Sequence, residues 1–163
     1  MATTTIIHIR FTFGMVEKLY DDWRHNIVLN IDDIIYYGRY YSCENEKKET
    51  MWWYNCVTNK VYSTQELVDN FSFNNQDNIM QSNNYIPLFK TDVIELEKVF
   101  LNQFYPRLVK IVYNNSLNCD YDISFKRVIE RNNLQREWFE YEKSQLRKDA
   151  IEWCCKNNLP YSK

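Results

Sequence analysis

The sequence predicts a single α+β domain in which a small antiparallel sheet, carrying an aromatic hairpin, packs against several helices. Three observations predict this class. The chain has 163 residues, of which 45% are hydrophobic and 17% aromatic, and this suffices for one core at the length of a typical domain. Residues 51–62 are mainly strand-forming residues interrupted by one turn. Residues 134–157 repeat large side chains at helical spacing, which predicts a long amphipathic C-terminal helix.

The first part of the chain is expected to alternate short strands and short helices. Apolar and polar side chains alternate over residues 6–13, which predicts a strand. A short helix is expected over residues 15–23, and a brief second strand over residues 27–29. Asn30 or Asp32 then caps another short helix, because either side chain can accept hydrogen bonds from the free backbone N–H groups at a helix start.

Residues 51–62 hold the clearest local signal. The segment Met-Trp-Trp-Tyr-Asn-Cys-Val has the composition of a strand, and Val-Tyr returns as its partner after a turn. Asn59 lies in that turn and tolerates the positive φ that tight turns need. Ser63 or Thr64, followed by Glu66, predicts a capping box that begins a helix at once.

The middle of the chain is expected to lead from an extended segment into a helix. Residues 72–84 are rich in Asn, Gln and Ser and predict a helix flanked by loops, or a long loop. Residues 85–88 are expected to be extended, because the residue before a proline avoids the α region. Thr91 or Asp92 caps an amphipathic helix, and Pro106 is expected to lie close to the end of this helix or to kink it.

The last part of the chain is strongly helical. A polar loop over residues 114–122 precedes a short helix around residues 125–129, and the final helix follows until Asn157-Asn158 and Pro160 stop it. The large side chains expected to lie on one stripe of the final helix and to close the core against the aromatic hairpin are Trp138, Phe139, Leu146, Ala150 and Trp153.

Composition excludes several classes of protein. The formal net charge is −2 with 26% charged residues, which is not typical of a disordered polyelectrolyte. No apolar run approaches the roughly 20 residues that a membrane helix needs, and the first fourteen residues lack the pattern of a signal peptide. We therefore expect no membrane partner. Only two glycines are present, so neither a dinucleotide-binding fingerprint nor a P-loop can be built.

The cysteines and the amino-acid composition indicate the cellular compartment and the kind of source genome. The five cysteines are scattered, and no pair has C-x-x-C spacing. An odd number of such thiols is typical of a reducing cytosol, where they act as small buried side chains. We expect no cofactor, no metal site and no catalytic residue. Abundant Asn, Tyr, Ile and Lys suggest an AT-rich genome of a protist, a low-GC bacterium or a large DNA virus, so we expect the cytoplasm, or the host cytoplasm or virion if the source is viral.

The order of several segments resembles a known family. The segments, quoted as they stand, are Leu-Asn-Ile-Asp-Asp-Ile-Ile at 29–35, Trp-Tyr-Asn-Cys-Val-Thr-Asn-Lys-Val-Tyr at 53–62, Tyr-Ile-Pro-Leu at 85–88, and the tail motifs Arg-Glu-Trp-Phe at 136–139 and Ala-Ile-Glu-Trp at 150–153. They are similar to the uncharacterised protein family one-five-eight, small and mostly bacterial proteins of unknown function. The resemblance implies a family-like core over residues 29–160 and an N-terminal extension over 1–28, within one domain of 1–163. It implies architecture and no reaction.

Aromatic residues suggest the function. Thirteen Tyr, nine Phe and five Trp exceed what a small core easily buries, and Tyr and Trp are favoured at protein–protein interfaces. We therefore expect a non-enzymatic intracellular interaction or assembly module with a protein partner or self-association. The residues of the expected partner surface are Tyr36, Tyr37, Tyr40, Tyr41 and Trp52.

Two other classes stay open. A nucleic-acid-binding module would use basic residues of the C-terminal helices, which are Lys126, Arg127, Arg131 and Arg136, or the Trp52, Trp53 and Tyr54 side chains as a stacking platform. Interleaved glutamates favour a solvated face instead. A hydrolase would need His8 or His25 beside a cysteine, or the aspartate pairs at 21–22 and 32–33, in a site that no recognised motif marks.

Overall fold

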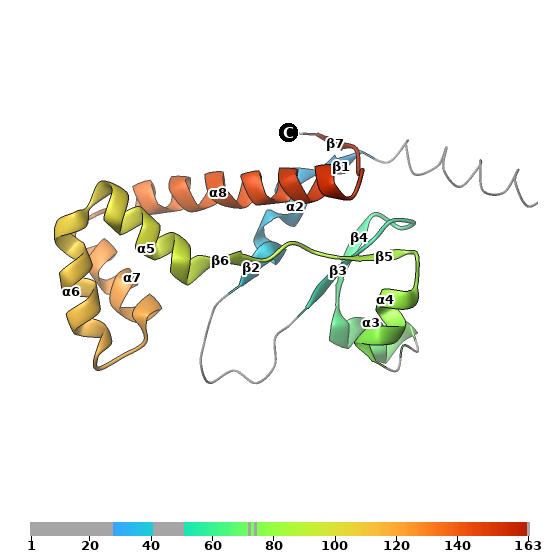
Figure 1. Cartoon of the computed structure of the whole chain (residues 1–163), viewed down its shortest axis with the longest axis horizontal. Coiled ribbons are helices and arrows are strands. Elements are labelled where there is room, and N and C mark those ends of the chain that lie inside the picture. Colours follow the sequence, from blue (N-terminus) through green and yellow to red (C-terminus); the bar gives the residue numbers. More distant parts are fainter. Residues whose placement is uncertain (1–27, 41–50, 72, 74, 163) are drawn as a thin grey trace, which may run out of the picture.

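The computed structural model describes residues 28–40, 51–71, 73 and 75–162. Short strands and helices lie at one end of the chain's long axis and a group of helices at the other, with helix α8 running along both (Figure 1). The elements in chain order are β1 (Leu29–Asn30), α2 (Ile31–Ile34), the 3-10 helix η1 (Ile35–Gly38), β2 (Arg39–Tyr40), β3 (Trp52–Asn55), β4 (Lys60–Ser63), α3 (Thr64–Phe71), α4 (Gln76–Gln81), β5 (Tyr85–Pro87), β6 (Thr91–Asp92), α5 (Val93–Phe104), α6 (Pro106–Ser116), α7 (Tyr121–Arg131), α8 (Gln135–Lys156) and β7 (Tyr161–Ser162). The α+β class is confirmed, whereas the elements expected over 6–23 lie outside the described residues.

Strands β3, β4 and β5 form an antiparallel sheet in the order β4-β3-β5. The turn of the hairpin contains Asn59 with φ of 55°, as the sequence predicts. The outer strand β5 ends in Pro87, which has no N–H group, and the Pro87 carbonyl accepts a hydrogen bond from the Trp153 indole at 2.9 Å. Helix α8 therefore contacts the end of this edge strand through Trp153.

The predicted helix starts are confirmed at the level of single hydrogen bonds. Asn30 caps α2, and its side chain accepts from the Asp32 amide. Ser63 and Glu66 form the capping box: the Glu66 amide donates to Ser63 Oγ, and the Ser63 amide donates to the Glu66 carboxylate. Asp92 caps α5 by accepting from the Glu95 amide.

Two short parallel strand pairs, β1–β7 and β2–β6, lie outside the three-stranded sheet. Strand β1 pairs with β7, so the start of the described core lies beside its end. Strand β2 pairs with β6, which holds Arg39 and Tyr40 next to the start of α5. Both pairs join segments that are far apart in sequence, and local patterns cannot predict such pairing.

The described residues form three core clusters, and α8 contributes to two of them. Near the hairpin, Leu146, Ala150 and Trp153 pack with Tyr54, and the Trp153 and Tyr54 rings meet edge to face at 5.7 Å. The expected docking of the final helix onto the tryptophan-bearing hairpin is therefore confirmed. The helical end has its own cluster, which consists of buried residues Phe100, Leu101, Val112, Phe125, Val128 and Ile129 with Trp138 and Tyr141 against it. The third cluster, Trp53, Leu67 and Ile79, lies between the sheet and helices α3 and α4.

The prediction is wrong for two members of the expected stripe. Trp138 packs against Phe125 at 4.9 Å in the helical end and not against the hairpin, and Phe139 is 46% exposed. The reason is that the two ends of α8 face different neighbours. Spacing within one helix cannot reveal which neighbour each end meets.

One of two predicted boundaries is confirmed and the other is wrong. Pro106 lies close to the end of α5, as expected, and is the first residue of α6, a position where the missing N–H group has no cost and the fixed φ suits a helix. Helix α6 continues through Ser116, so the loop expected over 114–122 shrinks to residues 117–120.

Besides the hydrogen bond from Trp153 to β5, polar contacts join α8 to three other elements. Arg39 of β2 pairs with buried Glu142 at 2.6 Å. Arg147 pairs with Asp32 of α2 at 2.9 Å, and the hydroxyl of Thr91 in β6 donates to Asp149. The exposed Arg147 pair contributes at most about 1 kcal/mol, so these contacts fix the orientation of α8 more than they stabilise it.

Gly38 supplies space for an aromatic ring. It is buried at the end of η1, and a Cβ atom there would overlap the ring of Phe89, which in turn lies 6.2 Å from the Trp153 ring of α8. Since Gly38 has no positive φ, its role is this close approach alone.

We expect Gly38→Ala to lower the free energy of unfolding by about 1–3 kcal/mol, because overpacking forces the Phe89 ring to move. Equilibrium urea denaturation measures the change. In a Phe89→Leu background the same substitution should cost clearly less, since the ring that the Cβ would meet is gone. An equal cost in the two backgrounds would contradict this contact.

Candidate functional site

The structure brings part of the predicted tyrosine surface together. Tyr36 and Tyr37 of η1 are 47% and 39% exposed, and the Tyr37 ring lies 4.8 Å from the ring of half-buried Trp52. Tyr40 lies in β2 without a described side chain, and Tyr41 lies outside the described residues. A small exposed aromatic surface therefore exists at Tyr36, Tyr37 and Trp52.

The hairpin is not a stacking platform. Trp53 and Tyr54, which would have to present their faces to bases, are 0% and 2% exposed. Trp53 belongs to the cluster above α3 and α4, and its indole donates to the Thr64 hydroxyl at 2.9 Å. Alternation along the strand places Trp53 on one face of the sheet and Trp52 with Tyr54 on the other, where Trp52 is half-buried against the cluster that contains Trp153.

The predicted basic residues do not form one free row. Lys126 pairs with Asp122 one turn earlier in α7, at 2.7 Å. Arg127 and Arg131 are exposed one turn apart on the same helix. Arg136 lies on α8, at the edge of a groove that the sequence did not predict.

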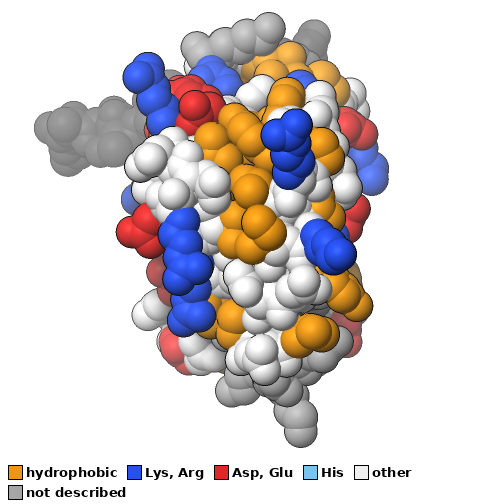
Figure 2. All heavy atoms as spheres, turned by 90° about the vertical axis from the view of Figure 1, so that its left-hand side faces the viewer, with side chains coloured by type: hydrophobic (Ala, Val, Ile, Leu, Met, Phe, Trp, Pro, Cys, Tyr) orange, Lys and Arg blue, Asp and Glu red, His pale blue; other side chains and the backbone are white. Residues whose placement is uncertain are grey.

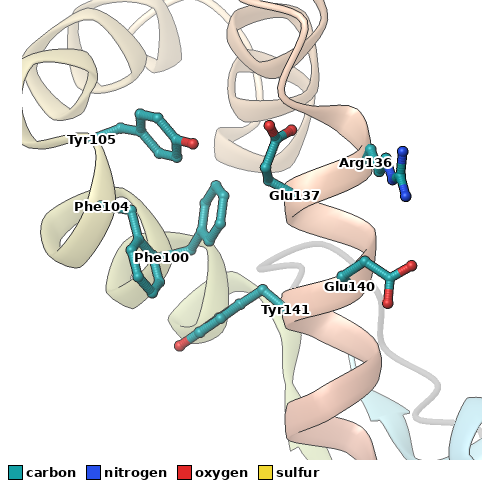
Figure 3. A pocket seen from close by; sticks show the side chains of 7 residues that line it. All are labelled: Phe100, Phe104, Tyr105, Arg136, Glu137, Glu140 and Tyr141. Carbon is teal, nitrogen blue, oxygen red and sulfur yellow. The ribbon is translucent and has the colours of Figure 1, made fainter.

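This groove lies between α5 and α8, at the helical end of the molecule (Figure 3). Its volume is about 520 Å³, and it is open to solvent. The residues that line it are Phe100, Phe104, Tyr105, Arg136, Glu137, Glu140 and Tyr141.

Four aromatic side chains form the floor and one wall of the groove. The Phe100 ring is buried and lies 5.2 Å from the Tyr141 ring and 5.4 Å from the Tyr105 ring. Phe104, one turn after Phe100, is 50% exposed and lies 5.7 Å from Tyr141. The rings gather here because α5 ends at Phe104 and Pro106 starts α6 in a new direction, which leaves Tyr105 at the corner.

Charged side chains of both signs line the α8 side of the groove. Glu137 turns towards the Tyr105 side, whereas Arg136 and Glu140 project from the solvent side of α8 (Figure 3). Within the described part of the chain, none of these three side chains forms an ion pair. The groove thus offers an apolar floor beside charges that a partner can neutralise.

Sequence reasoning missed the groove for a physical reason. Phe100, Phe104 and Tyr141 look like ordinary core residues at helical spacing. Phe100 is buried and Phe104 is half exposed because of the angle at which α5 packs against α8. That angle is a property of the tertiary structure.

A pair of carboxyl groups, those of buried Glu97 and partly exposed Asp122, lies one turn behind the groove floor. Glu97 of α5 is 1% exposed, and neither its Oε2 atom nor Oδ1 of Asp122 in α7 has a hydrogen-bond donor among the described residues. One proton on Glu97, donated to Asp122, satisfies both atoms at once. Burial, followed by the hydrogen bond to Asp122, raises the pKa of Glu97 to about 9, so this carboxyl is neutral at pH 7.

The described residues do not assemble the groups expected for hydrolysis. They contain no group of three or more His, Cys, Asp or Glu side chains placed to hold a metal ion. His8 and His25 lie outside the described residues. Burial raises the pKa of the Cys154 thiol to about 11, which is the opposite of the shift that activates a nucleophilic cysteine.

Comparisons with models of known protein families, with curated proteins and with solved structures found no match to this chain. The resemblance to the uncharacterised protein family one-five-eight therefore stays a prediction. In addition, no described helix combines the length and apolar character needed to cross a bilayer.

The pKa of Glu97 gives the stability a pH dependence. Because the folded state holds a proton between the ordinary pKa of 4.5 and about 9, the free energy of unfolding should fall as pH rises across this range and level off above it. We expect Glu97→Gln to remove this slope of up to about 1.4 kcal/mol per pH unit and to stabilise the protein by about 3 kcal/mol at pH 7.

Urea denaturation between pH 5 and pH 9 measures both effects. Glu95→Gln is the matched control, because Glu95 is an exposed carboxylate on the same helix. If Glu97→Gln and Glu95→Gln change the pH dependence equally, Glu97 does not hold the proton.

Proposed function

We propose that the chain is a non-enzymatic interaction module that binds a protein chain through the groove between α5 and α8. We place its action in the cytoplasm, or in the host cytoplasm or a virion if the source is viral. The observation that carries the proposal is the open aromatic groove itself, with half-exposed Phe104 at its mouth and charges that have no ion-pair partner among the described residues at its edge.

The chemistry of the groove suits a protein surface. Aromatic side chains bring a large contact area at a small entropic cost, and fully desolvated aromatic residues carry much of the binding energy at interfaces. Phe104 and Tyr141 already contact buried Phe100, so a partner that covers them meets a floor that is largely preformed. Charged residues around such an apolar centre are typical of an interface rim.

The surroundings favour a macromolecule over a small ligand. Hydrophobic side chains gather between Lys and Arg residues over the helical end of the molecule (Figure 2). Large apolar side chains that are at least 39% exposed on helices α5 to α8 and the α6–α7 loop are Val99, Phe104, Ile111, Tyr113, Leu117, Ile123 and Phe139. Apolar exposure of this extent is typical of a contact surface. The aromatic surface at Tyr36, Tyr37 and Trp52 is a second, smaller candidate for partner contact.

Nucleic-acid binding is the second candidate function, favoured by one observation. Arg127 and Arg131 are exposed on one face of α7 and form no ion pair among the described residues. A shift of labelled DNA or RNA that weakens steeply with salt, and less steeply in an Arg127→Ala/Arg131→Ala variant, would support it. No shift at micromolar protein and low salt would exclude it.

We expect Phe104→Arg to abolish partner binding, because it places a charge over the aromatic floor. The measurement is affinity capture from a lysate of the source cells, with the wild-type protein and the variant compared side by side. Met80→Arg is the matched control, since Met80 is 56% exposed on the distant helix α4.

A stoichiometric protein that the wild type and Met80→Arg both recover, and that Phe104→Arg loses, supports the groove as the contact surface. A copy of the chain itself counts as such a protein. If all three baits recover the same proteins in equal amount, the groove is not the contact surface.

A further inference from the structure

We infer that the occupant of the groove is a second copy of this chain, placed by a two-fold axis that sets the two grooves face to face. This inference rests on the proposed function, because it names the partner of the same groove. In this arrangement α8 lies across α8 of the other copy in antiparallel orientation, and α5 lies over α5.

Two of the three charges at the edge of the groove, those of Arg136 and Glu140, carry the argument. A two-fold axis places one patch against itself, so a patch of a single sign would repel its copy. Arg136 and Glu140 have opposite signs, lie one turn apart on the solvent side of α8, and form no ion pair among the described residues. In an antiparallel contact about an axis between them, Arg136 of each copy meets Glu140 of the other.

The shape of the groove agrees with the charges. Each copy presents one half-exposed Phe104 ring beside a groove of about 520 Å³, which is ample for an aromatic side chain. Placing the two grooves face to face seats each Phe104 ring against the aromatic floor of the other copy. The self-complementary unit is therefore an apolar centre flanked by two symmetry-related ion pairs.

Other exposed surfaces of the described chain are not self-complementary in this way. Arg127 and Arg131 on α7 have the same sign, and a two-fold contact there would bring like charges together. Tyr36 and Tyr37 are followed by the buried residue Gly38, and with half-buried Trp52 they form only a small surface among the described residues.

Sedimentation velocity of the full-length purified protein tests the inference over about 1 to 200 µM, a range suited to an interface of moderate affinity. We expect a reversible monomer–dimer equilibrium. Arg136→Glu alone, or Glu140→Arg alone, should raise the dissociation constant at least about tenfold, because each sets like charges opposite one another. Circular dichroism verifies that each variant is folded.

Mixing the two single variants gives the decisive measurement. Arg136→Glu leaves two acidic residues in one copy and Glu140→Arg leaves two basic residues in the other, so the mixed dimer regains both ion pairs. We expect the equimolar mixture to dimerise within about threefold of the wild-type dissociation constant. A defect of folding or of one local contact would not be repaired by mixing.

Three results would overturn the inference. These are a wild-type monomer at every concentration, a dimer that both charge reversals leave unchanged, and an equimolar mixture that stays as weak as its components. If the wild-type protein is a monomer but captures a different protein from the lysate, and Phe104→Arg no longer captures it, the proposed function stands. The groove is then assigned to that other protein. If capture is also insensitive to Phe104→Arg, the proposed function fails as well.

Discussion

The packing of helix α8 against two different clusters is the constraint on which the rest of the structure depends. Its C-terminal half buries Leu146, Ala150 and Trp153 against the hairpin, and its N-terminal half places Trp138 and Tyr141 against the helical end. Among the described residues, β2–β6 is a further link between these two ends, and it pairs only two residues from each strand. Burial of a large core side chain stabilises by about 1.5–3 kcal/mol, more than an exposed ion pair, so the apolar face of α8 joins the two ends.

The groove follows from the same arrangement. Tyr141 lies in the groove floor one residue before Glu142, which is held by Arg39 of β2. On the facing helix, Phe100 lies one turn after Glu97, whose proton joins α5 to Asp122 of α7. The floor is therefore backed on both helices by buried polar contacts that fix side-chain positions, and a rigid floor binds a partner without first having to be ordered. Buried carboxyl groups destabilise a core, and their place directly behind this surface suggests that they set its geometry.

Local chemistry in the sequence predicted the local structure well. The hairpin with Asn59 at its turn, the capping box of Ser63 and Glu66, and the cap at Asp92 each depend on residues within a few positions of one another. The groove, the separate cluster of Trp138 and the exposure of Phe139 depend on how α5, α7 and α8 cross, and no local pattern encodes that crossing. Of the predicted functional residues, Tyr36, Tyr37 and Trp52 do form an exposed surface. Arg136 lies beside a groove that the charge of this residue could not have indicated.

The role of α8 as the element that couples both ends can be measured directly with Leu146→Ala. Leu146 is fully buried in the cluster near the hairpin, so its truncation should cost about 2–5 kcal/mol. The test follows urea unfolding of this variant with two probes, far-ultraviolet circular dichroism for the helices and hydrogen exchange of amides in β3 and β4 for the hairpin. If α8 couples the ends, both probes should show one transition displaced by the same amount. Separate transitions, with the helical end retaining its wild-type stability while the hairpin loses protection, would contradict the account.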